Sequence, residues 1–264
     1  MEITEFLFRP KKTDEGIQKQ YTRQYLGLIE KFFSELAKNG LALESGAQVV
    51  KTAQGYECRC VACDKNAITE EHFAYETKKT LESLIRMSDG LPAIKDIGPD
   101  PLHGHCTCRS PSHLVMEPCA EREGTPIICG DCCESIPLYR LASSAADMEF
   151  DDVLRWRKLY RAYLYQCLLG IDSIDGEESY QMLHECVSTL TLAGRALAGQ
   201  VERFCSIPVY YPIYYQFERV PDRCPQCGAS WRNSYPDGVK SSHVCLACRL
   251  FASEQRGIYD TNKY

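Results

Sequence analysis

The chain has 264 residues, of which 44% are hydrophobic and 25% are charged, and its formal net charge is −6 at pH 7. This balance is typical of globular proteins and excludes collagen-like and low-complexity chains, while no apolar run approaches the ~20 residues that a membrane-spanning helix needs. The first residues lack the pattern of a secretory signal, so we expect a cytoplasmic protein that does not bind membranes. Without such a signal, 16 cysteines indicate metal sites rather than disulfides.

The first hundred residues predict six elements. In chain order they are a strand, a helix, two strands, a helix and a strand, at 3–8, 14–38, 48–53, 56–62, 69–87 and 92–97. The two central strands join at Gln54-Gly55, which predicts a hairpin, and Thr69 with two following acids marks a helix start. The order β-α-β-β-α-β is typical of a ferredoxin-like fold. We therefore predict a ferredoxin-like α+β domain over residues 1–98.

The remainder mixes cysteine-rich turns with helices, and the whole chain is predicted to be α+β. Apolar spacing predicts helices over 151–170 and 188–204, and an aromatic run follows at 209–215. We predict a cysteine-rich α+β domain over 99–217 with a second zinc site. The segment 218–264 is predicted to be a separate C-terminal zinc ribbon.

Two CxxC pairs near the end of the chain carry the strongest chemical signal. They are Cys224 with Cys227 and Cys245 with Cys248, and 17 residues separate the pairs. Each pair can bind one side of a tetrahedral ion, and this spacing is typical of structural zinc. Four cysteines leave no open coordination position, so we expect a structural rather than a catalytic ion. The alternatives are two disulfides or four buried thiols.

A second zinc site is predicted in the middle of the chain. Its expected ligands are Cys106 and Cys108, in a CxC pair, and Cys129 and Cys132, in a CxxC pair. His103 and His105 could replace one sulfur, and Cys119 and Cys133 are spare thiols nearby. The alternative is a cysteine-rich loop without an ion. Both predicted zinc ions are structural.

Other cysteines favour packing over chemistry. Cys58, Cys60 and Cys63 could bind a third metal with His72, but burial as small apolar side chains is the favoured interpretation. Three single cysteines fall among apolar residues and are expected to pack, namely Cys167, Cys186 and Cys205.

Several enzyme signatures are absent from the sequence. It contains no GxxxxGK[ST] phosphate loop, no GxGxxG after a strand, no HExxH and no GxSxG. With both metals fully ligated by thiolates, we predict that the protein has no catalytic residues and is not an enzyme.

Seven motifs occur together over residues 100–252. They are Cys106-Thr107-Cys108, Cys129-Gly130-Asp131-Cys132, Ile136-Pro137-Leu138-Tyr139-Arg140-Leu141, Trp156 with Tyr160, Val209-Tyr210-Tyr211, Cys224-Pro225-Gln226-Cys227-Gly228 with Trp231, and Cys245 to Cys248-Arg249-Leu250. In this order they resemble an uncharacterised bacterial family described as zinc-ribbon-containing and as a candidate for nucleic-acid binding. The resemblance implies both metal sites and a setting beside polymorphic toxin genes. The chain departs from the family pattern at Cys133, an added thiol, and at 251–253.

Charge and resemblance together favour a protein partner. An acidic protein can capture a basic toxin quickly, because complementary charge steers association. We therefore expect a non-enzymatic zinc protein that acts as an immunity or inhibitor protein against a bacterial toxin. Contact candidates are the acidic stretches 147–152 and 172–178 and the aromatic run 210–215, for which a core strand is the alternative. The other function considered is RNA or DNA binding through the ribbon, where Trp231 and Tyr235 could stack on bases or fill its core.

Overall fold

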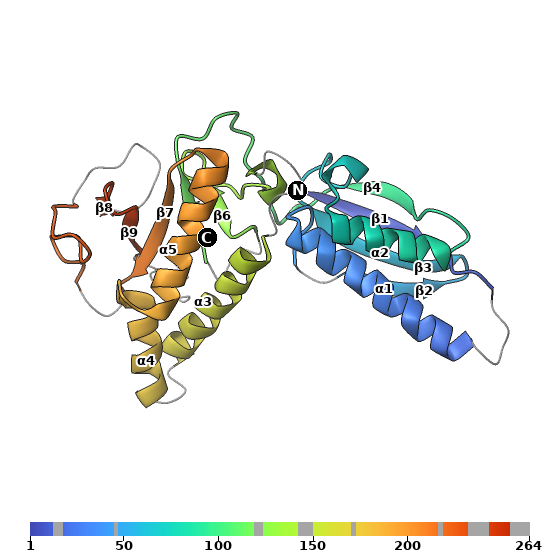
Figure 1. Cartoon of the computed structure of the whole chain (residues 1–264), viewed down its shortest axis with the longest axis horizontal. Helices are drawn as coiled ribbons and strands as arrows, with labels where there is room; N and C mark the ends of the chain where they lie inside the picture. Colours follow the sequence, from blue (N-terminus) through green and yellow to red (C-terminus); the bar gives the residue numbers. More distant parts are fainter. Residues whose placement is uncertain are drawn as a thin grey trace. The chain divides into compact units, whose positions relative to one another are not determined.

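The computed structural model shows a mixed α+β protein (Figure 1). The structure describes residues 1–12, 18–44, 47–118, 124–141, 150–169, 173–215, 219–231 and 243–253. Contacts divide the chain into two compact units. The first comprises Met1–His105, Arg122–Thr125 and Pro137–Asp151, and the second comprises Cys106–Glu121, Pro126–Ile136 and Asp152–Tyr264.

The first unit contains a four-stranded antiparallel sheet. Its strand order is β2-β3-β1-β4, where the strands in that order are Gln48–Thr52, Gly55–Ala62, Glu2–Phe8 and Ala93–Pro99. Helices α1 (Gln18–Lys38) and α2 (Tyr75–Arg86) lie side by side on one face of this sheet (Figure 1). From β1 to β4, the order of the described strands and α-helices is the predicted β-α-β-β-α-β.

Alternation along β1 explains which sheet face the helices cover. Thr4, Phe6 and Phe8 are buried, whereas the residues between them are half-buried. The two phenylalanine rings pack edge-on against Phe32 of α1, with ring centroids about 6 Å apart. A period of two places every second side chain on one face of a strand, so this pattern aligns the aromatic side of β1 with the helices.

The second helix begins six residues later than the sequence predicts. Residues Glu70–His72 form a short 3-10 turn, and Phe73 and Ala74 are extended before α2 starts at Tyr75. The His72 ring explains the delay, because its Nδ1 atom lies 3.0 Å from Thr69 Oγ1 and 3.1 Å from the carbonyl oxygen of Asn66. These local bonds compete with a helical backbone.

A short 3-10 turn, η2 (Leu138–Leu141), binds a buried carboxylate of the same unit. Asp64 is 2% exposed and accepts hydrogen bonds from Tyr139 Oη at 2.7 Å and from Arg140 Nη2 at 2.5 Å. Burial favours the neutral acid, but the bond from Tyr139, the backbone N–H of Asn66 and the Arg140 charge outweigh it and lower the pKa of Asp64.

The second unit is built on a five-stranded mixed sheet of order β6-β5-β7-β9-β8. In that order the strands are Ile127–Cys129, Leu114–Met116, Val209–Tyr214, Leu250–Ser253 and Val244–Cys245. The inner pairs β5/β7 and β7/β9 are parallel, and the outer pairs β5/β6 and β8/β9 are antiparallel. All six residues of β7 are buried, so the predicted aromatic run is a core strand and not an exposed contact surface.

Three helices belong to the described part of this unit. They are α3 (Asp151–Leu169), α4 (Ser173–His184) and α5 (Thr189–Cys205). Trp156 of α3 packs against Tyr211 of β7 with ring centroids 5.6 Å apart, and the Ser188 side chain caps α5 by accepting from the N–H of Thr191. The sequence predicts α3 and α5 but not α4, whose run of polar and acidic residues gives no clear apolar stripe.

The C-terminal segment shares this sheet with the middle of the chain. Strand β9 pairs with β7, and Val244 and Phe251 enter one apolar cluster with Val115 and Tyr210. The three predicted domains, 1–98, 99–217 and 218–264, remain predictions about folding boundaries. None of the described helices combines the length and the apolar character that crossing a bilayer requires.

Candidate metal centres

Two groups of four cysteines meet in the second unit. In each group all four Sγ atoms lie within 4.8 Å of one another. The middle tetrad consists of Cys106, Cys108, Cys129 and Cys132, and the C-terminal tetrad of Cys224, Cys227, Cys245 and Cys248. Four cysteines are the donor set of a structural zinc site, and both groups fit a tetrahedral ion.

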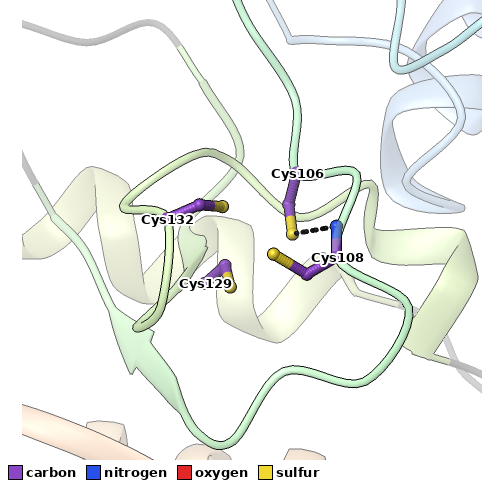
Figure 2. Close-up of side chains that lie close together, drawn as sticks. All are labelled: Cys106, Cys108, Cys129 and Cys132. Carbon is purple, nitrogen blue, oxygen red and sulfur yellow. Dashed lines mark hydrogen bonds between the residues drawn. The ribbon is translucent and has the colours of Figure 1, made fainter. Parts of the chain in front are cut away.

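Figure 2 shows how the middle tetrad is assembled. Cys106 and Cys108 come from a segment without helix or strand, whereas Cys129 ends β6 and Cys132 lies in the following turn. The backbone N–H of Cys106 donates to the Ser135 carbonyl at 2.7 Å, which fixes the CxC segment beside the turn. The N–H of Cys108 approaches Cys106 Sγ at 3.3 Å, a contact that stabilises a thiolate (Figure 2).

The C-terminal tetrad has sulfur spacing that suits zinc. A tetrahedral ion with Zn–S bonds of about 2.3 Å places its sulfurs about 3.8 Å apart. The observed separation of Cys227 Sγ and Cys245 Sγ is 3.7 Å. These two sulfurs belong to different CxxC turns, so the two halves of the site already meet at the distance that one ion requires.

The three CxxC turns of the two tetrads share one backbone form. The residue before the first cysteine pairs with the residue three positions after the second, and these pairs are Ile128–Ser135, Arg223–Ser230 and Val244–Phe251. The residue directly after the second cysteine has a positive φ, which is 61° at Cys133, 72° at Gly228 and 54° at Arg249. The turns are therefore three copies of one knuckle, each closed by a left-handed residue.

Contacts from one neighbouring segment fix the middle knuckle. Asp131 accepts from the backbone N–H of Ser112 at 2.8 Å and also from its hydroxyl, and these bonds lower the pKa of Asp131. The N–H of Gly130 donates to the carbonyl of His113 at 3.0 Å. A Cβ atom at position 130 would lie 1.7 Å from His113 Nε2, so only glycine lets the buried imidazole cover this knuckle.

A charged pair fixes the C-terminal knuckle. Arg249 follows the last ligand, and its Nη2 atom lies 3.3 Å from Glu202 Oε1 of α5. The same guanidinium lies over the Tyr210 ring, 5.4 Å from its centroid, and donates to the Leu246 carbonyl at 3.1 Å. Arg249, which has a left-handed backbone conformation, thus links the C-terminal knuckle to α5 and to β7.

Burial and hydrogen bonding shift the pKa values of the ligand thiols in opposite directions. Burial raises the pKa of Cys106, Cys224 and Cys248 above the ordinary thiol value. The exposed Cys227 differs, because the backbone N–H of Ala229 and the neighbouring sulfurs lower its pKa to about 7. Four adjacent thiols cannot all ionise without a cation, so a bound metal would have to displace their protons.

His103, His105 and Cys133 lie outside the middle tetrad. The His103 Nδ1 atom bonds to the Asp100 carboxylate, and the His105 Nδ1 atom lies 3.1 Å from the Met1 nitrogen. Cys133 occupies the left-handed position of the knuckle. Cys119 lies outside the described residues.

The remaining cysteines behave as packing residues. Cys58 and Cys63 belong to the core of the first unit, Cys60 packs against it, and burial raises the pKa of all three thiols to about 12. Cys167 and Cys186 are buried and Cys205 is half-buried. Among the residues that the structure describes, only the two tetrads bring three or more ligating side chains together.

Of the residues proposed for partner contacts, the structure describes only some. Trp231 is fully buried, and its Nε1–H donates to the Pro221 carbonyl at 2.7 Å, so this ring fills the core rather than stacking on bases. Tyr235 lies outside the described residues. The same holds for residues 147–149 and 172 and for the side chains of 173–175, which make up much of the two acidic stretches.

Comparison with known proteins gives relatives without an assigned activity. Residues 108–214 match the model of a family described as "Domain of unknown function (DUF2310)". An uncharacterised protein of Haemophilus influenzae is 23% identical over 210 residues, covering 76% of this chain and 78% of that protein. A second uncharacterised protein of the same organism is 27% identical over 151 residues, covering 54% of this chain and 72% of its own length. No solved structure matches the chain.

Proposed function

We propose that the protein binds two zinc ions, one in each cysteine tetrad, and that both ions are structural. The supporting observation is the geometry of the two tetrads, in each of which four cysteine Sγ atoms lie within 4.8 Å of one another. Cysteine thiolates favour zinc over calcium or magnesium, and four of them complete its tetrahedral coordination. Neither ion would then offer an open position for water or substrate, so the protein is proposed not to be an enzyme.

We further propose that the protein works by binding a basic protein partner, as an immunity or inhibitor protein does with a toxin. Charge supports this proposal. Each zinc with four thiolates adds about −2, which takes the formal charge from −6 to about −10. A strongly acidic protein repels nucleic acid and attracts basic proteins.

Three side chains of the second unit that could serve in nucleic-acid binding have partners within the fold. Trp231 and Tyr211 are buried, and Arg249 is paired with Glu202. Single-strand binding relies on exposed aromatic rings and free cations, so these three residues do not favour that function.

We also propose a ferredoxin-like fold for the first unit. Its support is the β-α-β-β-α-β order together with the all-antiparallel strand order β2-β3-β1-β4. An experimental structure with this sheet covered by helices on one face only would agree with the proposal, and a different strand order would contradict it.

Two measurements test the function. Metal analysis of protein purified without added zinc should return close to two equivalents. One equivalent would contradict one of the proposed sites, and none would contradict both. Calorimetric titration with a basic toxin domain from the neighbouring genes should then give one-to-one binding. Micromolar binding to RNA or DNA that weakens steeply with salt, without binding to the toxin domain, would favour nucleic acid instead.

A further inference from the structure

The two tetrads differ in how far solvent reaches their ligands. In the middle tetrad Cys108 and Cys132 are both exposed, whereas Cys106 and Cys129 are buried. In the C-terminal tetrad Cys227 is the one exposed ligand, and Cys248 is half-buried. Oxidants react with accessible thiolates, so the middle tetrad presents two reactive sulfurs where the other presents one.

The backbone around the exposed sulfurs also differs. Each ligand of the C-terminal tetrad belongs to a CxxC knuckle closed by backbone pairing, as in the Val244–Phe251 and Arg223–Ser230 pairs. Cys108 instead lies in the irregular segment 103–108, beyond the Cys106–Ser135 backbone bond. A disulfide requires its own geometry, and an irregular segment can adopt it at lower cost than a closed knuckle can.

We propose that the middle tetrad is an oxidation site, at which a peroxide joins Cys108 to Cys132 and the zinc ion is released. This inference rests on the proposed zinc occupancy. One exposed thiolate attacks a peroxide oxygen, becomes a sulfenic acid and expels hydroxide. The second thiolate, with its Sγ within 4.8 Å, attacks that sulfur, expels a second hydroxide and forms the disulfide. Two thiolates are oxidised, one hydrogen peroxide is reduced, and two protons from the buffer convert the two hydroxides to water.

The test follows zinc release from the full chain, after metal analysis has shown two bound equivalents. Hydrogen peroxide is added in the presence of a chromogenic zinc chelator, and thiol alkylation with peptide mass spectrometry maps the products. We expect the first equivalent to leave about tenfold faster than the second, in step with a Cys108–Cys132 disulfide. A starting content below two equivalents would contradict the proposed function, which keeps that failure separate from this one.

Histidine variants provide matched controls, because histidine can replace one sulfur ligand of zinc. Cys108→His should retain two equivalents and abolish the fast release, whereas Cys227→His, at the exposed ligand of the other tetrad, should leave it unchanged. Cys133→Ser should also leave it unchanged, since this thiol lies outside the tetrad. Equal release rates from both sites, fast release from the C-terminal site, or a fast phase that survives in Cys108→His would each overturn the proposal.

Discussion

At the scale of single residues, Gly130 is the position where one added carbon matters most for the middle site. A Cβ atom there would meet the His113 ring at 1.7 Å, and the ring is buried and cannot move aside freely. We expect Gly130→Ala to destabilise the second unit by about 1–3 kcal/mol, the usual cost of overpacking. Chelator competition should also show weaker zinc binding at the middle site.

A matched glycine in the same unit tests the specificity of this effect. No atom lies within 4 Å of the Cβ position at Gly176 in α4, so Gly176→Ala should stabilise the unit by about 0.5–1 kcal/mol through helix propensity. Urea unfolding followed by fluorescence of Trp156 and Trp231 measures both changes. Equal effects of the two substitutions would contradict the steric argument.

The left-handed position after each knuckle gives a second residue-scale prediction. Gly228 fills it with φ of 72°, whereas Cys133 fills the same position with φ of 61°. The left-handed conformation costs a non-glycine residue about 1–2 kcal/mol, and glycine's greater freedom in the unfolded chain offsets part of the gain. We expect Cys133→Gly to raise the free energy of unfolding by about 0.5 kcal/mol and Gly228→Ala to lower it by about 1 kcal/mol. The reverse order in urea titrations of the zinc-loaded protein would rule out strain at Cys133.

The sequence reveals the cysteine tetrads more readily than what surrounds them. CxxC spacing is local, and it alone predicts that Cys224 and Cys227 face one ion. The roles of Gly130 and Asp131 depend on Ser112 and His113, which lie 17 or more positions earlier in the chain. No local pattern predicts that contact. The knuckle itself leaves one local signal in the sequence. Gly228, directly after Cys227, is a residue suited to the left-handed conformation that closes the knuckle.

At the scale of elements, the Asp64 carboxylate links η2 to the loop after β3. The pH dependence of stability tests this link. The folded-state pKa of Asp64 is lowered, so its contribution to stability is present above the ordinary value of about 3.9 and is lost as pH falls through the lower folded value. We expect Asp64→Asn to cost about 1–3 kcal/mol at pH 7. The difference from the unmodified protein should shrink as pH falls below about 4.

Hydrogen exchange of amides in β1 and β3 provides the readout for this element, because both tryptophans lie in the second unit. Glu71→Gln is the control, since Glu71 is an exposed acid of the same unit and should leave exchange unchanged. A loss of unfolding free energy in Asp64→Asn that stays constant down to pH 3 would show that the carboxylate charge does not stabilise the link between η2 and the loop after β3.

Elements with strong periodicity are predictable from the sequence, and elements defined by distant partners are not. The hairpin of β2 and β3 follows from alternation around Gln54-Gly55, and α5 follows from its apolar stripe and its Ser188 cap. The parallel pairing of β9 with β7 joins residues about 40 positions apart. Short strands such as β8, with two residues, carry no periodic signal of their own.

At the scale of the molecule, the five-stranded sheet of the second unit has a cysteine tetrad at each edge. The edge strand β6 ends in Cys129, and the opposite edge strand β8 ends in Cys245. Edge strands this short have few backbone partners and are marginal without support. Each proposed ion would therefore stabilise one edge, while β7 between them is fixed by its own buried side chains.

Removing one ion at a time tests whether the edges are stabilised separately. Because Cys129 belongs only to the middle tetrad, Cys129→Ser should halve the zinc content and raise amide exchange in β6 and β5, with β8 and β9 unchanged. Cys245→Ser should raise exchange in β8 and β9 and leave β6 protected. In both variants the first unit, whose core contains no tetrad cysteine, should keep its exchange protection. Loss of protection across all five strands in either variant would show that the ions stabilise the sheet as one cooperative body, because a sheet stabilised separately at its two edges must fray from the edge that loses its ion.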